Sequence, residues 1–183
     1  MPPRSFEEGL EFGRRGERLV ESWLQSIGVA TMPAYDFGGQ GAPSIRRGTW
    51  RVPVPDILGM RKGRAFWFEV KTHEAAALNS TRKCHIHGVR ERLWEGYKQI
   101  AIESGMSVFV LVLELDTGEL RRANVADIAT WRCECRPCKD GGPAYRCRNG
   151  GKQEVYFRRD DMGRLCTFSR AQCDAVRSER EAA

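Results

Sequence analysis

The sequence lacks any long apolar run. Its longest, Val108 to Leu113, has the length of a β-strand, whereas a membrane-spanning helix needs about 18 or more apolar residues. Residues 1–8 carry acids and have no apolar core of the kind found in secretory signal peptides. The sequence also has no internal repeat. We therefore expect no membrane segment and a cytoplasmic location, in the host cytoplasm if the chain is phage-encoded.

The chain is also short of negative charge. It has 24 Asp and Glu residues against 30 Lys and Arg, a formal net charge of +6. This balance suits a polyanionic partner, because every neutralised phosphate of a nucleic acid releases counterions. Net charge also serves solubility, so charge alone leaves both interpretations open. A length of 183 residues predicts one domain over 1–183.

Residues 5–27 are predicted to form an amphipathic helix. Ser5 and Glu8 have the spacing of a capping box. Apolar or small residues recur at steps of three and four, and Glu17 lies among them: Leu10, Gly13, Glu17, Val20, Leu24, Ile27. A carboxylate on the inward side of a helix must be paired, bound to a metal or placed at the rim of a cleft. The alternative is a stripe centred on Leu19 and Trp23, which leaves Glu17 outside.

The remaining elements predict an α/β fold. We expect a loop over 36–49, two strands over 52–60 and 64–72, an irregular polar segment over 73–88, a helix over 89–104, strands over 107–115, 119–125 and 154–158, and a last helix over 169–182. This order predicts a mixed central β-sheet of about four to five strands flanked by helices.

The strongest motif is Pro55-Asp56, followed thirteen residues after the aspartate by Glu69-Val70-Lys71. Mg²⁺ prefers oxygen ligands and takes one or two carboxylates from a protein. Asp56, Glu69 and the backbone carbonyl of Val70 are therefore candidate Mg²⁺ ligands. Lys71 is a candidate to orient or deprotonate a water, or to offset negative charge. The alternative is a solvated strand face with a weak ion pair between Glu69 and Lys71.

With these residues the chain resembles the PD-(D/E)XK nuclease superfamily, and within it the archaeal-type Holliday junction resolvases and related phage nucleases. The stretches that carry the resemblance are GRRGERLVESWLQSIG, VPDILG, FWFEVKT and HGVRERLWEGYKQIAIESGMSVFVLVLEL, within residues 10–115. The resemblance implies a restriction-endonuclease-like fold. It also implies that Glu17, Asp56, Glu69 and Lys71 carry catalysis with Mg²⁺ or Mn²⁺.

The implied function is a Mg²⁺-dependent endonuclease that cleaves DNA, including junctions or branched DNA, in repair, recombination or phage DNA processing. Resolvases act as dimers, which makes a homodimer one expectation for the assembly. Two alternatives stay open: a zinc-containing DNA-binding protein without catalysis, and a nuclease directed at RNA.

Two further groups of residues are candidate binding residues. Arginines cluster near the Pro-Asp motif, and we expect Arg46, Arg47 and Arg51 to contact nucleic acid, with His87 at the edge of the site. An insert at about 131–150 contains cysteines in the pattern C-x-C-x₂-C-x₈-C: Cys133, Cys135, Cys138, Cys147. Four thiolates close a tetrahedral Zn²⁺ site in many proteins, and free thiols are the alternative.

Overall fold

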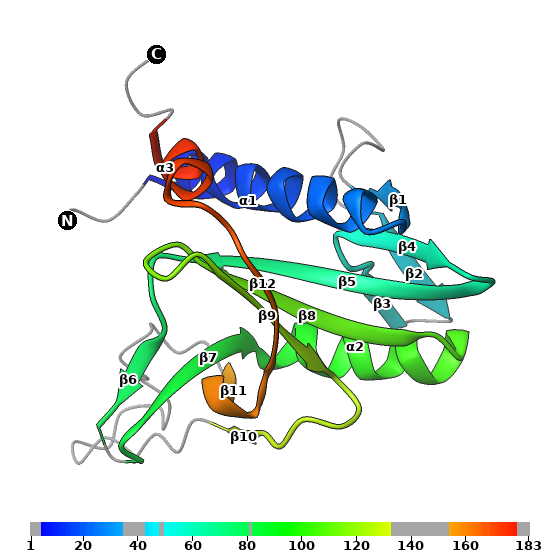
Figure 1. Cartoon of the computed structure of the whole chain (residues 1–183). Helices are drawn as coiled ribbons and strands as arrows, with labels where there is room; N and C mark the ends of the chain where they lie inside the picture. Colours follow the sequence, from blue (N-terminus) through cyan, green and yellow to red (C-terminus); the bar gives the residue numbers. More distant parts are fainter. Residues whose placement is uncertain (1–4, 35–42, 48–49, 81, 133–153, 179–183) are drawn as a thin grey trace, which may run out of the picture.

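A computed structural model of the chain describes residues 5–34, 43–47, 50–80, 82–132 and 154–178 (Figure 1). Its centre is a six-stranded sheet with the order β1-β4-β5-β8-β9-β12. The strands are β1 (Ala30–Pro33), β4 (Ile57–Arg61), β5 (Arg64–His73), β8 (Ser107–Glu114), β9 (Glu119–Asn124) and β12 (Gly163–Thr167). Only β5 and β8 run parallel. The expected mixed sheet is confirmed, with six strands instead of four to five.

Helices pack on both faces of this sheet. Helices α1 (Phe6–Ser26) and α3 (Arg170–Ser178) lie on one face, and α2 (Glu91–Ser104) lies on the other (Figure 1). Each face buries its own apolar cluster. Within the described residues no helix is long and apolar enough to cross a membrane.

Helix α1 begins as the sequence predicts but is rotated about its axis. The Ser5 backbone donates to Glu8 Oε2 at 2.7 Å and the Glu8 backbone to Ser5 Oγ at 3.2 Å, so the capping box is confirmed. The buried residues are Phe12, Gly16, Val20 and Leu24. Leu10 is 49% exposed and Ile27 37%, so the expected stripe was wrong at both ends. The stripe centres between the two predicted phases, because Leu19 and Trp23 also pack against the core.

Several segments hold more strand than their composition predicts. The expected loop contains β2 (Ser44–Arg47), which pairs with β3 (Trp50–Pro53). The expected irregular segment contains β6 (Ala77–Asn79) and most of β7 (Cys84–Arg90). Together with β10 (Trp131–Arg132) and β11 (Glu154–Arg158), these last two form a second sheet in the order β10-β11-β7-β6. A short 3₁₀ helix, η2 (Arg159–Asp161), follows β11.

Helix α1 approaches β5 very closely at Gly16. A Cβ atom on Gly16 would lie 1.8 Å from Thr72 Oγ1 and 2.9 Å from Thr72 Cβ. Only a residue without a side chain permits this approach, which brings the next residue of the helix, Glu17, near the C-terminal end of β5 and within electrostatic reach of Lys71.

We expect Gly16→Ala to destabilise the protein by about 1–3 kcal/mol, because the added methyl group overpacks the contact with Thr72. Gly9 is the matched control, since it lies in the same helix and a Cβ atom added there would have no other atom within 4 Å. Gly9→Ala should stabilise the helix by up to about 1 kcal/mol through propensity alone. Urea unfolding of both variants measures the difference, and equal effects would contradict the close packing.

Candidate active site

The strand register brings the two acids of the Pro-Asp and Glu-Val-Lys motifs together. Ile57 pairs with Phe68 as the first residue of β4, so the register continued by one residue sets Asp56 opposite Glu69. The backbone N–H of Val70 donates to Asp56 Oδ2 at 2.8 Å. The Asp56 carboxylate thus accepts a backbone hydrogen bond from β5 at a position that β4 does not reach. The predicted neighbourhood of the two carboxylates therefore rests on a specific hydrogen bond.

Glu69 and Lys71 project from β5 toward the face that carries α2. Glu69 is 3% exposed, and Lys71 Nζ donates to Glu69 Oε1. Burial disfavours the charged Lys71, but the charges of Glu69 and Asp56 outweigh it and raise the lysine pKa. Tyr97 of α2 is buried beside them, and burial followed by the charge of Glu69 raises its pKa. Lys71 is therefore an ammonium group, and Tyr97 is a neutral phenol.

Glu17 of α1 belongs to the same group of charges. Burial is the main cause that raises its pKa, and the charge of Glu69 adds to it, while Lys71 opposes both. The pKa of Asp56 is raised well above its usual range, first by burial and then by the charge of Glu69, with a smaller contribution from Glu17. The four predicted catalytic residues thus interact electrostatically at one place, although they come from three parts of the chain.

Three neighbouring acids facing one ammonium group fit a divalent cation. A cation relieves the repulsion that raises the pKa of Asp56, and Mg²⁺ needs only one or two protein carboxylates together with carbonyl oxygens and water. Across the described residues, no three His, Cys, Asp or Glu side chains lie together in a way that could hold a metal ion. A Mg²⁺ or Mn²⁺ ion here would be held by two carboxylates, Asp56 and Glu69, with the Val70 carbonyl and water, and this site stays a prediction.

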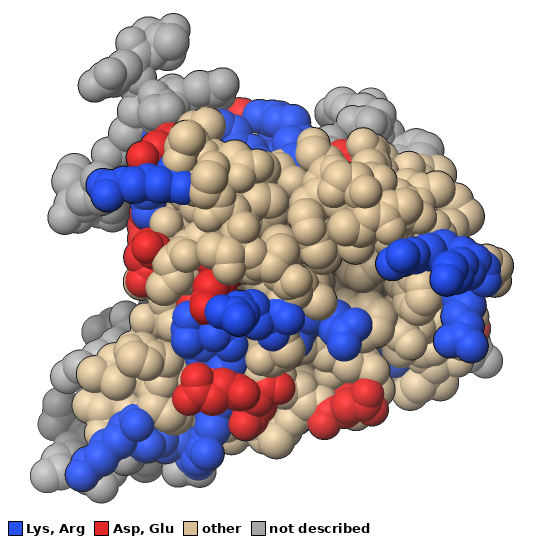
Figure 2. All heavy atoms as spheres, in the orientation of Figure 1, with Lys and Arg blue, Asp and Glu red and all other residues tan. Residues whose placement is uncertain are grey.

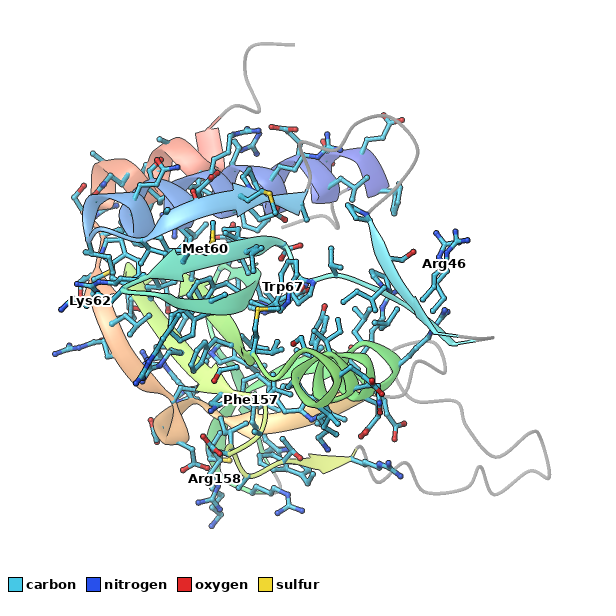
Figure 3. The ribbon with its side chains drawn as sticks, turned by 90° about the vertical axis from the view of Figure 1, so that its right-hand side faces the viewer. Arg46, Met60, Lys62, Trp67, Phe157 and Arg158 are labelled. Carbon is cyan, nitrogen blue, oxygen red and sulfur yellow. The ribbon has the colours of Figure 1, made fainter. Side chains whose placement is uncertain are left out.

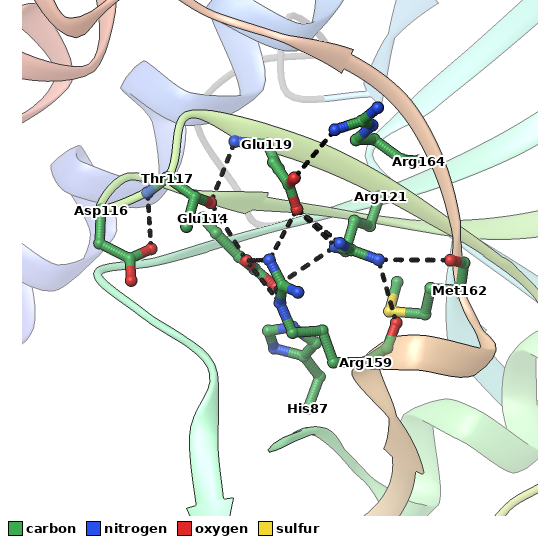
Figure 4. A network of polar contacts seen from close by, with 9 residues as sticks. All are labelled: His87, Glu114, Asp116, Thr117, Glu119, Arg121, Arg159, Met162 and Arg164. Carbon is green, nitrogen blue, oxygen red and sulfur yellow. Dashed lines mark hydrogen bonds and ion pairs between the residues drawn. The ribbon is translucent and has the colours of Figure 1, made fainter. Parts of the chain in front are cut away.

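The structure corrects the expectation for His87. The residue is 3% exposed and its side chain lies in the interior, where Nε2 is 2.8 Å from Glu114 Oε1. Glu114 also accepts two hydrogen bonds from Arg159 Nε at 2.9 Å and one from Arg159 Nη2 at 2.7 Å (Figure 4). Burial is the main cause that lowers the pKa of His87. A buried imidazole in this network does not reach a phosphate, so His87 supports the packing of β7 on the main sheet.

His73, two residues after Lys71 on the same face of β5, lies beside this network. Its ring centroid is 5.3 Å from that of His87. Burial, and then the neighbouring His87 and Lys71, lower the pKa of His73 to about 4. His73 is therefore neutral and adds no charge to the site.

The predicted arginines lie on the β2–β3 hairpin. Arg46 and Arg51 are directly opposite each other across the two strands, and Arg51 Nε donates to Ser44 Oγ at 2.9 Å. Both arginines are exposed. On the other face of the hairpin Val52 is 2% exposed and packs against Gly96 of α2, where a Cβ atom would lie 1.9 Å from Val52 Cγ2. Arg47 is the last residue of β2 and follows Arg46 directly.

The four cysteines at 133, 135, 138 and 147 lie outside the described residues, so the zinc site stays a prediction. The described cysteines, Cys84, Cys166 and Cys173, are free thiols.

The mixed sheet with helices on both faces is the kind of fold that the sequence resemblance implies, and solved structures share it. The chain is similar to Hjc, a Holliday junction resolvase from Archaeoglobus fulgidus, with a TM-score of 0.51 and 15% identity over 81% of this chain and 90% of that one. A nuclease from a fusellovirus is also similar, with a TM-score of 0.40 and 10% identity over 97% and 96%. The sequence matches no protein-family model and no curated protein. At these identities the likeness shows the fold.

We expect Asp56→Asn to raise the melting temperature at neutral pH in EDTA. The raised pKa of Asp56 means that its ionisation costs folding free energy. In the wild type the stabilising, protonated form is fully present below the ordinary aspartate pKa of about 3.9, and stability is lost as pH rises through the folded pKa. The variant has no such loss, so the two melting temperatures should converge in acid.

Mg²⁺ should reverse the order of the two melting temperatures, so that the wild type melts above Asp56→Asn. An ion at about 100 times its dissociation constant stabilises a protein by about 2.7 kcal/mol, and the variant lacks one of the ligands. Melting curves with and without Mg²⁺ measure this shift, with the exposed Asp161→Asn as control. Equal Mg²⁺ shifts in all three proteins would contradict a cation site at Asp56.

Proposed function

We propose that this chain is a metal-dependent endonuclease that hydrolyses DNA phosphodiester bonds. The observation that carries the proposal is the Asp56–Glu69 pair with the Lys71 ammonium group beside it, on a PD-(D/E)XK nuclease fold. A buried Glu69, a half-buried Asp56 and the Lys71 ammonium group beside them destabilise the fold unless a ligand or ion uses them.

Each residue of the group has a role that follows from its charge and position. Asp56, Glu69 and the Val70 carbonyl hold Mg²⁺ or Mn²⁺, which when bound lowers the pKa of a water and stabilises charge on a phosphoryl oxygen. Lys71 is protonated because Glu69 and Asp56 raise its pKa, so it offsets negative charge and orients the water instead of removing its proton. Glu17, with a raised pKa, holds a water or a proton at the edge of the site.

The Arg46–Arg51 pair provides a contact for the DNA backbone. Like charges directly opposite each other on a hairpin are destabilising, and both side chains are exposed. A phosphate placed between two guanidinium groups removes this repulsion. The hairpin is anchored on α2 by Val52 and leads directly into the Pro55-Asp56 turn, so a phosphate bound there lies near the acids. Arg47 is proposed to take part from the same strand.

The substrates proposed for this site include branched DNA, with a role in repair or recombination or in the processing of phage DNA. The similar structure from Archaeoglobus fulgidus is that of a Holliday junction resolvase, which supports this choice at the level of the fold.

Purified protein should cleave supercoiled plasmid in Mg²⁺ and not in EDTA. Glu69→Gln and Lys71→Met should each lower the rate at least about a hundredfold, because each removes a group that stabilises charge in the transition state. Plasmid nicking and linearisation on gels measure the rates, and the melting temperatures identify variants that remain folded.

The matched controls are Glu95→Gln and Lys98→Met. Glu95 and Lys98 form an ion pair of the same kind at 3.5 Å on the surface of α2, with 49% and 43% exposed side chains. These variants should cleave at the wild-type rate. Undiminished cleavage by Glu69→Gln would show that the activity does not come from this site. Cleavage of RNA alone would replace DNA as the substrate.

Arg46→Ser combined with Arg51→Ser should weaken DNA binding and reduce its salt dependence. Loss of two phosphate contacts lowers the slope of log K against log salt concentration by about 1.8 for duplex DNA. The control is Arg164→Ser combined with Arg170→Ser, whose side chains are 63% and 93% exposed on other elements. Fluorescence anisotropy at several salt concentrations measures the slopes, and equal slopes in both double variants would remove the hairpin from the interface.

A further inference from the structure

The catalytic face of the sheet continues beyond the acids as an apolar surface. Residues on alternate positions of a strand share a face, so Leu58 and Met60 follow Asp56 on β4, and Trp67 and Ala65 precede Glu69 on β5. The register joins them into two rows across the strands. The first row is Met32–Leu58–Trp67 and the second is Ala30–Met60–Ala65. We call these two rows the apolar platform.

The platform is open to solvent at its outer part. Met32 is 41% exposed and Met60 47% exposed, while Leu58, Ala65 and Trp67 are half-buried. Trp67 packs at its inner side against the apolar cluster under α2, and the main contacts of α2 are with β8, β3, β7 and β11, away from Met32 and Met60. A single exposed apolar side chain needs no explanation, but two adjacent uncharged rows beside a charged site do.

The position of the platform relative to the acids limits what it binds. Its first row is two residues, or about 7 Å, along the strands from the Asp56–Glu69 pair, and the second row is about 7 Å farther. A nucleotide whose phosphate is held at the acids therefore has its base within reach of the platform. The faces of a base are apolar and stack on aromatic and apolar side chains once they leave the duplex.

Cations lie on both sides of this surface. The turn after Met60 carries three exposed cations, Arg61, Lys62 and Arg64, and they form no ion pair with any acid in the described part of the chain. Figure 2 shows basic side chains gathered at this tip of the molecule. In Figure 3 Met60 and Trp67 lie between Lys62 on one side and Arg46 on the other. An apolar surface between cations matches a strand with its bases inward and its phosphates paired at both ends.

The residues of the cationic turn are not those that would stabilise the turn best. Lys62 and Gly63 both have positive φ, 50° and 73°, which is the geometry of a type I′ turn. Asn-Gly is the sequence that fits this turn best, and Arg61 and Arg64 face each other as like charges across the strands. Local stability is therefore lower than it could be, while positive charge is concentrated beside the platform.

We propose that the apolar platform binds unstacked bases next to the cleaved phosphate and so directs the enzyme to DNA with unpaired bases at that point. This inference rests on the proposed function, because it assigns the substrate class of the same site. An intact duplex presents sugars and phosphates to the platform, which leaves the exposed faces of Met32 and Met60 without an apolar partner.

The test compares a linear duplex with the same sequence containing a short unpaired bubble. The wild type should prefer the bubble by about tenfold or more in kcat/KM, the equivalent of one stacked base. Met32→Ser combined with Met60→Ser should lose about tenfold of this preference and keep its rate on the duplex. Both side chains are exposed, so the variant should fold normally. Trp67→Phe keeps a ring and should keep most of the preference.

The control is Ile102→Ser, which removes a 74% exposed apolar side chain from α2. It should leave the preference unchanged. Binding of the same two DNAs measured without divalent ions separates this inference from the proposed function. If the wild type cleaves nothing but still binds the bubble more tightly through Met32 and Met60, the endonuclease proposal fails and the platform stands.

An equal affinity and rate for bubble and duplex, or a double variant that keeps the preference, would overturn the platform. Sedimentation of the same variants tests whether a second copy of the chain occupies the platform. A wild-type dimer that dissociates in the double serine variant, with the substrate preference intact, would assign the surface to self-association and also overturn the proposal.

Discussion

The hydrogen bond from the Val70 backbone to Asp56 Oδ2 is the contact on which the site depends. β4 begins only at Ile57, so the edge of β5 beyond Glu69 has a free N–H. The Asp56 side chain occupies that position and continues the ladder with a carboxylate in place of backbone. The same contact leaves the acid facing Glu69 and next to Lys71. One bond therefore completes a sheet edge and aligns the ionisable groups.

This grouping of ionisable side chains lowers the folding stability of the protein. Burial and mutual repulsion raise the pKa values of Asp56 and Glu17, so their charged forms are held at a cost in free energy. The rest of the fold provides the rigidity that maintains them. The close contact of Gly16 with Thr72 fixes α1 on β5, and the buried Glu114–Arg159 network fixes β7 and η2 against the far end of β8. Such local conflicts are concentrated where proteins bind and react.

The sequence predicts the chemistry of the site better than its surroundings. The acids and the lysine could be predicted because Asp56 directly precedes β4, and β4 and β5 are joined by a short turn, so that sequence spacing sets the register with Glu69 and Lys71. Arg159 and Glu114 are 45 residues apart and no periodicity joins them, so their network, and with it the burial of His87, could not be predicted. The extra strands β6 and β7 were missed because polar residues in a small sheet obscure the alternation of apolar and polar residues that predicts a strand. The rotation of α1 was missed because Leu10 and Ile27 lie near the helix ends, where an apolar pattern extends past the core that it covers.

The pairing of β10 with β11 has a consequence for how such a protein can vary. Trp131 pairs with Tyr156 and Arg132 with Val155, so Arg132 and Glu154, which flank residues 133–153 in the sequence, lie close together. Loop closure costs grow only slowly with length, and two adjacent strand ends accept a connection of almost any size. Evolution can therefore lengthen, shorten or replace the intervening residues as a cassette without moving any group on β4 or β5.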